Sequence, residues 1–111
     1  MKVGKRRWDK QSLHDEAVID RADHYYKKGC NVKADVPGLI LGNKQMPKII
    51  RRPELINDHR PDVIAKCSDK LFIEEVETKN TLKRDKKQHE AFKKYVKNEP
   101  NKKFNIVVAD E

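Results

Sequence analysis

The segment from Leu71 to Lys79 begins with apolar residues, like a buried β-strand, and ends with charged side chains that could act on a phosphate. Successive side chains of a strand point to opposite faces, so Glu75, Glu77 and Lys79 should share the face on which the apolar run begins. Glu77 and Lys79 would stand roughly 6–7 Å apart along the strand. That spacing suits a carboxylate and an amine acting on one metal-bound phosphate, although an ion pair on a solvated sheet face has the same pattern.

A further carboxylate could join this pair from a neighbouring strand. Pro61-Asp62 opens the apolar run 63–65, and a connection through 66–70 would form a hairpin that brings Asp62 near Glu77. Two or three carboxylates can hold Mg²⁺ or Mn²⁺ through oxygen ligands. Such an ion polarises a phosphodiester, while an amine such as that of Lys79 orients water or stabilises charge on the phosphate. The alternative is an ordinary strand opening beside a surface ion pair worth under ~1 kcal/mol.

An amphipathic helix should precede these strands. Ser12 is a candidate N-cap for a helix over about 13–28, and Gly29 would end it. Asp15 falls within the apolar stripe of this helix, and Glu16 falls on its margin. Either acid could favour the helix dipole, or could point toward a site at the edge of the sheet.

A second helix is expected over about 82–97, opened by Asn80-Thr81. Gln88 lies in the middle of its apolar side, where a polar amide needs a partner. Reaching into a neighbouring site is one solution, and a hydrogen bond to backbone is the other. The opposite face of this helix is basic.

The remaining segments complete an α/β pattern. Residues 31–36 alternate as a short strand, Pro37-Gly38 marks a turn, and 39–41 could extend that strand or pair with it. Residues 42–59 are expected to be an irregular loop with a short helical turn at 54–56. The other expected strands cover about 61–66, 71–79 and 104–109. The order α-β-β-β-α-β, with a parallel last strand, predicts an α/β fold: a three-layer sandwich around a mixed central sheet.

Composition bounds the size and the partners of the chain. Its 111 residues suffice for one domain, so we expect a basic N-terminal arm at 1–11 and a single α/β domain at 12–111. The formal net charge of +8 favours a polyanionic partner. Cys30 and Cys67 lack zinc-ligand spacing and are expected to be buried thiols in a reducing cell. No apolar run approaches the ~20 residues of a membrane helix, which favours a soluble, cytoplasmic protein.

Basic residues from three segments could contact a phosphate backbone, or could be solvated surface. They are Lys5, Arg6 and Arg7 in the arm, Arg51, Arg52 and Arg60 in and after the loop, and Lys83, Lys86 and Lys87 on the second helix.

The chain resembles the PD-(D/E)xK nuclease superfamily, especially its archaeal Holliday-junction resolvase-like and restriction-endonuclease-like members. Pro61-Asp62 and Glu77-Thr78-Lys79 match its two defining motifs, and the order of elements is similar to that of its core. The resemblance implies that Asp62 and Glu77 are metal ligands and that Lys79 is the catalytic lysine. It also implies that the carbonyl of Thr78 is a further ligand.

The same resemblance implies two more site residues. The acid of the first helix that serves the metal would be Asp15 or Glu16, and Gln88 would match the glutamine that several branches carry after the lysine. The aromatic residue that one branch places four positions later would fall at Phe92, where that branch has tyrosine.

Together these features predict a Mg²⁺- or Mn²⁺-dependent, endonuclease-like phosphodiesterase. Its substrate would be nucleic acid, DNA rather than RNA, and it would act as a homodimer because enzymes of this size rarely span a duplex alone. One alternative is a non-catalytic nucleic-acid-binding domain with a degenerate nuclease fold. A third reading is a protein-interaction domain whose charge serves solubility.

Overall fold

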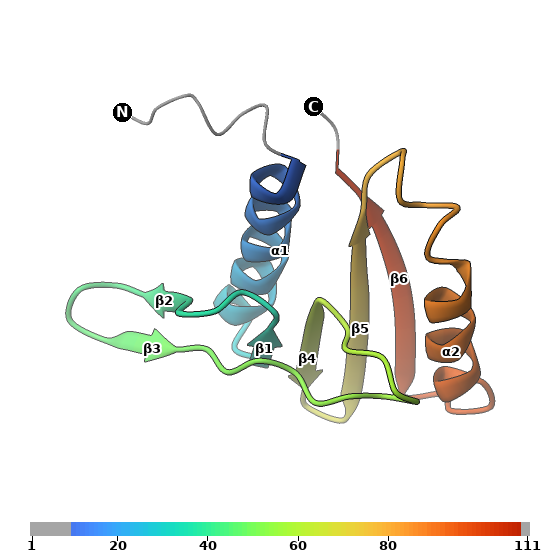
Figure 1. Ribbon diagram of the computed structural model, residues 1–111. Coiled ribbons are helices and arrows are strands. Elements are labelled where there is room, and N and C mark those ends of the chain that lie inside the picture. The colour runs from blue at the N-terminus through green and yellow to red at the C-terminus, as the bar shows by residue number, and fades with distance from the viewer. Residues whose placement is uncertain (1–9, 110–111) are drawn as a thin grey trace.

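A four-stranded sheet lies between two helices in the computed structural model, which describes residues 10–109 (Figure 1). Its strands, in spatial order, are β1 (Asn31–Ala34), β4 (Val63–Cys67), β5 (Lys70–Glu77) and β6 (Lys102–Val108). The helices are α1 (Lys10–Lys27) on one face and α2 (Lys86–Val96) on the other. β4 pairs antiparallel with β1 and β5, while β5 and β6 are parallel. The predicted mixed α/β fold with a mixed sheet is therefore confirmed.

The chain contains two strands more than predicted. β2 (Ile40–Gly42) and β3 (Pro47–Ile49) pair with each other in a separate antiparallel hairpin that projects beside α1 (Figure 1). The expectation that 39–41 would extend or pair with the first strand is therefore wrong. Proline cannot donate to a strand ladder, and Pro47 at the start of β3 disguised this strand within the expected loop.

The helical turn predicted at 54–56 is also absent from the described chain. Ile56 instead forms an isolated bridge with His59, around a tight turn at Asn57 and Asp58. Both turn residues have positive φ, 49° and 70°, a conformation that Asn and Asp tolerate better than most residues.

The helices differ from their predicted bounds at their starts. α1 begins at Lys10, so Ser12 lies inside the helix and is not its N-cap. Its predicted end holds: Gly29 follows with φ of 89°, and its N–H donates to the carbonyl of Tyr26. α2 begins at Lys86, later than predicted, because residues 79–85 form successive turns. No helix among the described residues is long and apolar enough to cross a membrane.

Apolar side chains pack on both faces of the sheet. On the α1 face, Val18 and Ala22 pack with strand residues that are almost fully buried: Val32, Ala34, Val63, Ala65 and Val76. On the α2 face, Phe92 is fully buried and meets the ring of Phe104 at 5.6 Å between centroids, while Ile73 is fully buried in β5. Burial of both faces fixes β5 as a rigid central element.

A buried ion pair ties α1 to β5. Glu74 is fully buried and accepts from Arg21 through both oxygens, Nε to Oε1 at 2.6 Å and Nη2 to Oε2 at 2.9 Å. The hydroxyl of Tyr25 donates to Oε2 at 2.5 Å, and the amide of Asn105 adds a longer contact. Burial alone would raise the pKa of Glu74, but these donors outweigh it and the pKa is lowered. Glu74 is therefore a charged residue of the core, with its partners built in.

The two cysteines form a disulfide, so the expectation of free thiols is wrong. Cys30 directly precedes β1 and Cys67 ends β4. Because Asn31 pairs with Lys66, the cysteines face each other across the strands, with their Cα atoms 4.5 Å apart. Cα atoms at this separation suit a disulfide. The pairing depends on the β1–β4 register, which cysteine spacing alone did not reveal.

Candidate active site

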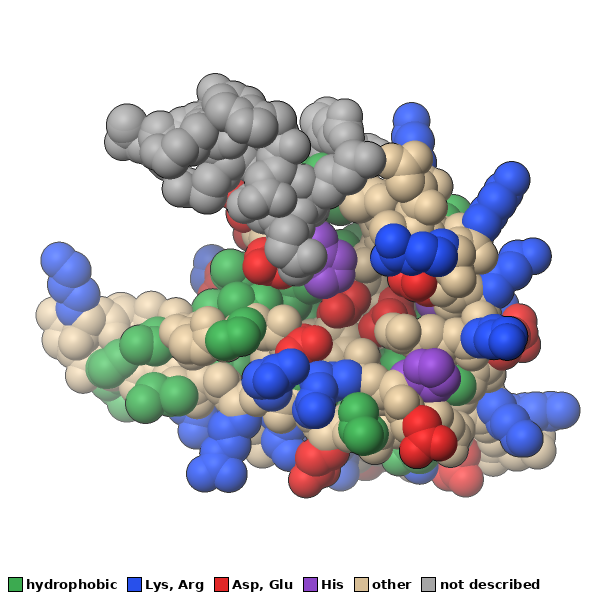
Figure 2. Space-filling model, viewed as in Figure 1, with side chains coloured by type: hydrophobic (Ala, Val, Ile, Leu, Met, Phe, Trp, Pro, Cys, Tyr) green, Lys and Arg blue, Asp and Glu red, His purple; other side chains and the backbone are tan. Residues whose placement is uncertain are grey.

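A cavity of about 330 Å³ opens where β4 begins and β5 ends. It is lined by His14 of α1, Asp62, the β5 residues Glu75, Val76 and Glu77, the turn residues Thr78, Asn80, Thr81, Arg84 and Asp85, and Gln88 of α2. In Figure 2 acidic and histidine side chains lie in a hollow at the middle of the view, with Lys and Arg side chains projecting around it. The cavity thus brings together side chains from α1, the start of β4, β5, the turn after β5 and α2.

Strand register brings Asp62 and Glu75 together. A two-residue turn pairs Cys67 with Lys70, so the register reaches Val63 opposite Glu74. The next step places the backbone N–H of Asp62 against Glu75, where it donates to Oε1 at 2.9 Å. In return, the N–H of Val76 donates to Asp62 Oδ2 at 2.7 Å. Each carboxylate is thus held by backbone of the other strand.

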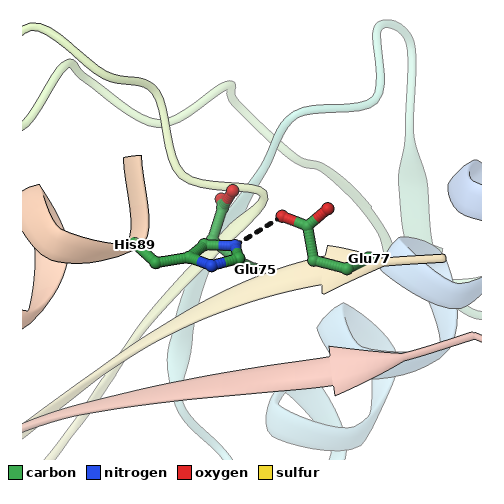
Figure 3. A group of neighbouring side chains, drawn as sticks. All are labelled: Glu75, Glu77 and His89. Carbon is green, nitrogen blue, oxygen red and sulfur yellow. Dashed lines mark hydrogen bonds and ion pairs between the residues drawn. The ribbon is translucent and has the colours of Figure 1, made fainter. Parts of the chain in front are cut away.

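Glu77, two residues further along β5, points into the same region. Its Oε1 accepts from the hydroxyl of Thr81 at 2.5 Å, and its Oε2 lies 2.7 Å from Nε2 of His89 (Figure 3). Gln88, the neighbour of His89 on α2, donates from its amide to Oε2 of Glu75. The turn after β5 and the start of α2 therefore hold the two glutamates in place.

Burial and mutual repulsion control the charge of this group. Burial first, and then the charge of Asp62, raises the pKa of Glu75 to about 9. Burial also raises the pKa of Glu77, although Thr81 and His89 oppose the shift. The hydrogen bond to Asp62 raises the pKa of His14 to about 9, against the effect of burial, so this ring is a cation at neutral pH.

The predicted residues fall into two groups. Asp62, Glu77 and Gln88 lie in the cavity. Thr78 also lines it, but its carbonyl accepts the N–H of Thr81 at 3.1 Å and so belongs to the turn. Lys79 is exposed beyond the end of β5 and does not line the cavity. The expected pairing of Asp62 with a motif at 77–79 is therefore displaced by two residues toward Glu75.

The acid expected from the first helix is replaced by a histidine. Among the described residues that line the cavity, α1 contributes His14, whose Nε2 lies 3.3 Å from Oδ2 of Asp62. Asp15 contacts the other nitrogen of that ring at 3.2 Å, and Glu16 is exposed. Neither acid lines the cavity.

Of the basic residues expected at nucleic acid, those that the structure describes lie outside the cavity. Arg51, Lys83, Lys86 and Lys87 are exposed, Arg52 pairs with Asp35 at 2.6 Å, and Arg60 donates to the carbonyl of Pro53. Lys5, Arg6 and Arg7 lie outside the described residues. The arginine that lines the cavity is Arg84, which the sequence had not singled out.

Sequence reasoning missed Glu75, His14 and His89 as site residues. For Glu75 a signal existed, because strand alternation already placed it on the face of Glu77. Counting back from a two-residue turn at 68–69 would have paired it with Asp62. The two histidines carried no comparable signal in the sequence.

The donor set fits a divalent cation. Asp62, Glu75 and Glu77 offer carboxylate oxygens, the ligands that hard divalent ions prefer. One potential ligand atom from each of Glu75, Glu77 and His89 lies within 4.8 Å of the other two. These four residues are at most 8 % exposed, so a bound ion would be shielded from bulk water on the protein side.

Comparisons with known proteins identify a family for the chain. The family model described as REase_AHJR-like, a restriction-endonuclease-like family of the PD-(D/E)xK type, matches residues 7–111. Comparisons with curated proteins and with solved structures found no match. The chain belongs to the REase_AHJR-like family of restriction-endonuclease-like proteins.

Proposed function

We propose that the protein is a nuclease that hydrolyses phosphodiester bonds in DNA with the help of Mg²⁺ or Mn²⁺. The observation that carries the proposal is that the Asp62 and Glu75 carboxylates line one cavity, Glu75 held by the N–H of Asp62 and Asp62 held by the N–H of Val76. Buried carboxylates from two strands have no structural need to adjoin, and their mutual repulsion is relieved by a cation. A restriction-endonuclease-like family supplies the reaction class.

Six residues of the cavity have roles in this proposal. Asp62 and Glu75 hold the ion, Glu77 adds a further oxygen, and Gln88 orients Glu75 through its amide. An ion held by these residues would supply Lewis acidity, which polarises a phosphodiester and lowers the pKa of a water molecule. Arg84 lies where it can neutralise charge on the phosphate, as does the ring of His14 while it is a cation.

The motif lysine of the superfamily corresponds here to a glutamate. With Glu75 opposite Asp62, the residue two positions further on is Glu77, while Lys79 lies outside the cavity. We propose that Arg84 supplies the positive charge that the lysine would provide, and that Lys79 contacts phosphates away from the reacting bond. The exposed arginines and lysines, with the N-terminal arm, would bind the backbone of DNA. Two copies of the chain would span the duplex as a homodimer.

A cleavage panel tests the proposal. Linear duplex, single-stranded, branched and RNA substrates would be incubated with Mg²⁺, Mn²⁺ or EDTA. We expect metal-dependent cleavage of DNA, lost by at least ~10²-fold in Asp62→Asn. Asp69→Asn, on the exposed turn between β4 and β5, is the matched control and should cleave normally. Cleavage that persists in EDTA or in Asp62→Asn would refute the proposal.

One observation favours the second candidate, a non-catalytic nucleic-acid-binding domain with a degenerate nuclease fold. Glu77 occupies the lysine position and is engaged by both Thr81 and His89. Such a domain would bind DNA with strong salt dependence but would show no turnover with any ion. The same panel, read by both gel shift and cleavage, separates the two candidates.

A further inference from the structure

A histidine buried beside the carboxylates gives this site a nitrogen donor. One ring nitrogen of His89 and one oxygen from each of Glu75 and Glu77 lie within 4.8 Å of one another (Figure 3). Two ligands about 2.1 Å from one ion are at most roughly 4.2 Å apart. Small side-chain shifts therefore suffice to bring all three atoms into a single coordination sphere.

The imidazole is held in this position from several sides. His89 is 4 % exposed, its backbone N–H donates to Asp85, and its ring lies 6.2 Å from that of Phe104. The ring is therefore almost completely shielded from solvent. Nε2 and Glu77 Oε2 face each other at 2.7 Å, so an ion that binds here displaces the hydrogen they share.

Nitrogen ligation changes the choice of ion. Mg²⁺ keeps oxygen ligands and several waters, whereas imidazole binds divalent transition ions well. Resting on the proposed metal-dependent function, we infer that His89 is a ligand with Glu75 and Glu77, and that the site takes a transition ion such as Mn²⁺ in preference to Mg²⁺. The rival role for His89 is positioning alone, through its hydrogen bond to Glu77.

Pulsed EPR with Mn²⁺ as the probe distinguishes ligation from positioning. The full chain, with ¹⁵N in histidine, should show a directly coordinated histidine nitrogen when Mn²⁺ binds without any DNA. His89→Gln should remove that coupling and weaken Mn²⁺ binding on the order of 10- to 100-fold, with a smaller effect on Mg²⁺. His59→Gln, a half-buried loop histidine outside the site, should retain the coupling and the affinity.

His14 provides the sharpest control, because its ring also adjoins a carboxylate of the cavity. We expect His14→Gln to keep the histidine coupling to Mn²⁺. Loss of the coupling in His14→Gln but not in His89→Gln would overturn the inference, as would bound Mn²⁺ with no histidine coupling. Equal affinity for Mn²⁺ and Mg²⁺ would overturn the stated preference.

The inference and the proposed function can fail separately. Metal-dependent cleavage by a protein whose Mn²⁺ lacks histidine coupling would overturn the inference and leave the nuclease proposal intact. Coupling that depends on His89, in a protein that cleaves no substrate, would uphold the inference and refute the nuclease proposal. Circular dichroism of His89→Gln establishes that the variant is folded before either reading is made.

Discussion

Replacing Glu75 with glutamine should stabilise the metal-free protein while abolishing metal binding. Glu75 is 2 % exposed, and burial together with the charge of Asp62 raises its pKa from 4.5 to about 9. Between these two values the folded state binds one proton more than the unfolded state. The stability contributed by the protonated group is therefore complete below pH 4.5 and is lost as the pH rises toward 9.

The size of the effect follows from this window. Each pH unit inside it costs about 1.4 kcal/mol, so about 3 kcal/mol is lost between pH 4.5 and pH 7. Glutamine has nearly the same shape and does not titrate. Glu75→Gln should therefore be more stable than the wild type by up to about 3 kcal/mol at pH 7, and the difference should shrink toward pH 4.5.

Urea denaturation in EDTA, repeated from pH 5 to pH 8, measures this difference as a shift in midpoint at constant slope. Glu99→Gln, on an exposed turn, is the matched control and should change stability by less than about 0.5 kcal/mol. Added Mn²⁺ should stabilise the wild type by mass action and leave Glu75→Gln unchanged. A variant less stable than the wild type at pH 7 would show that burial and the charge of Asp62 do not raise the pKa of Glu75.

Three further predictions concern the frame around the site. Arg21→Ala should cost about 3–5 kcal/mol in urea denaturation because it leaves Glu74 buried without its partner; replacing both residues by methionine should restore most of the loss. Lys79→Ala should change cleavage by less than about 3-fold, since the side chain is exposed outside the cavity; a loss of ~10²-fold would return it to the catalytic group. Reducing the Cys30–Cys67 disulfide, which spans 37 residues, should lower stability by about 3–4 kcal/mol, and thiol counting under denaturing conditions checks that the bond is present.

Strand alternation in the sequence was sufficient to place charge on one face of β5, but not to fix its partner. The face depends on a period of two, which is local. The partner depends on the turn, where Ser68 adopts a positive φ of 56° that its residue type does not announce. The expected connection through 66–70 and the observed turn of two residues place the opposite strand, and with it Asp62, at different positions relative to Glu75 and Glu77. Whether Asp62 adjoins Glu75 or Glu77 was therefore decided by the backbone conformation of the turn, which composition does not encode.

The β2–β3 hairpin was missed for a local reason, the proline at the start of β3. For the cysteines and Gln88 the deciding contact lies on another element, and the disulfide forms because β1 and β4 align. Gln88 was expected either to reach into a neighbouring site or to bond to backbone, and its amide donates to Glu75 on another element. In both cases the partner from another element, rather than local propensity, determined the role of the residue.

Two adjacent glutamates on β5 show how the partners of a buried carboxylate decide whether its pKa falls or rises. Glu74 and Glu75 are both buried, one on each face. Glu74 meets a bidentate Arg21 and needs nothing further, so its pKa falls. Glu75 meets a backbone N–H and an amide, neither of which carries charge, and stands beside Asp62, so its pKa rises. Of the two glutamates, Glu75 on the cavity face is therefore the one without a countercharge among the described residues. Among the described residues no lysine or arginine pairs with Glu75, and the metal ion of the proposed function would supply the missing positive charge.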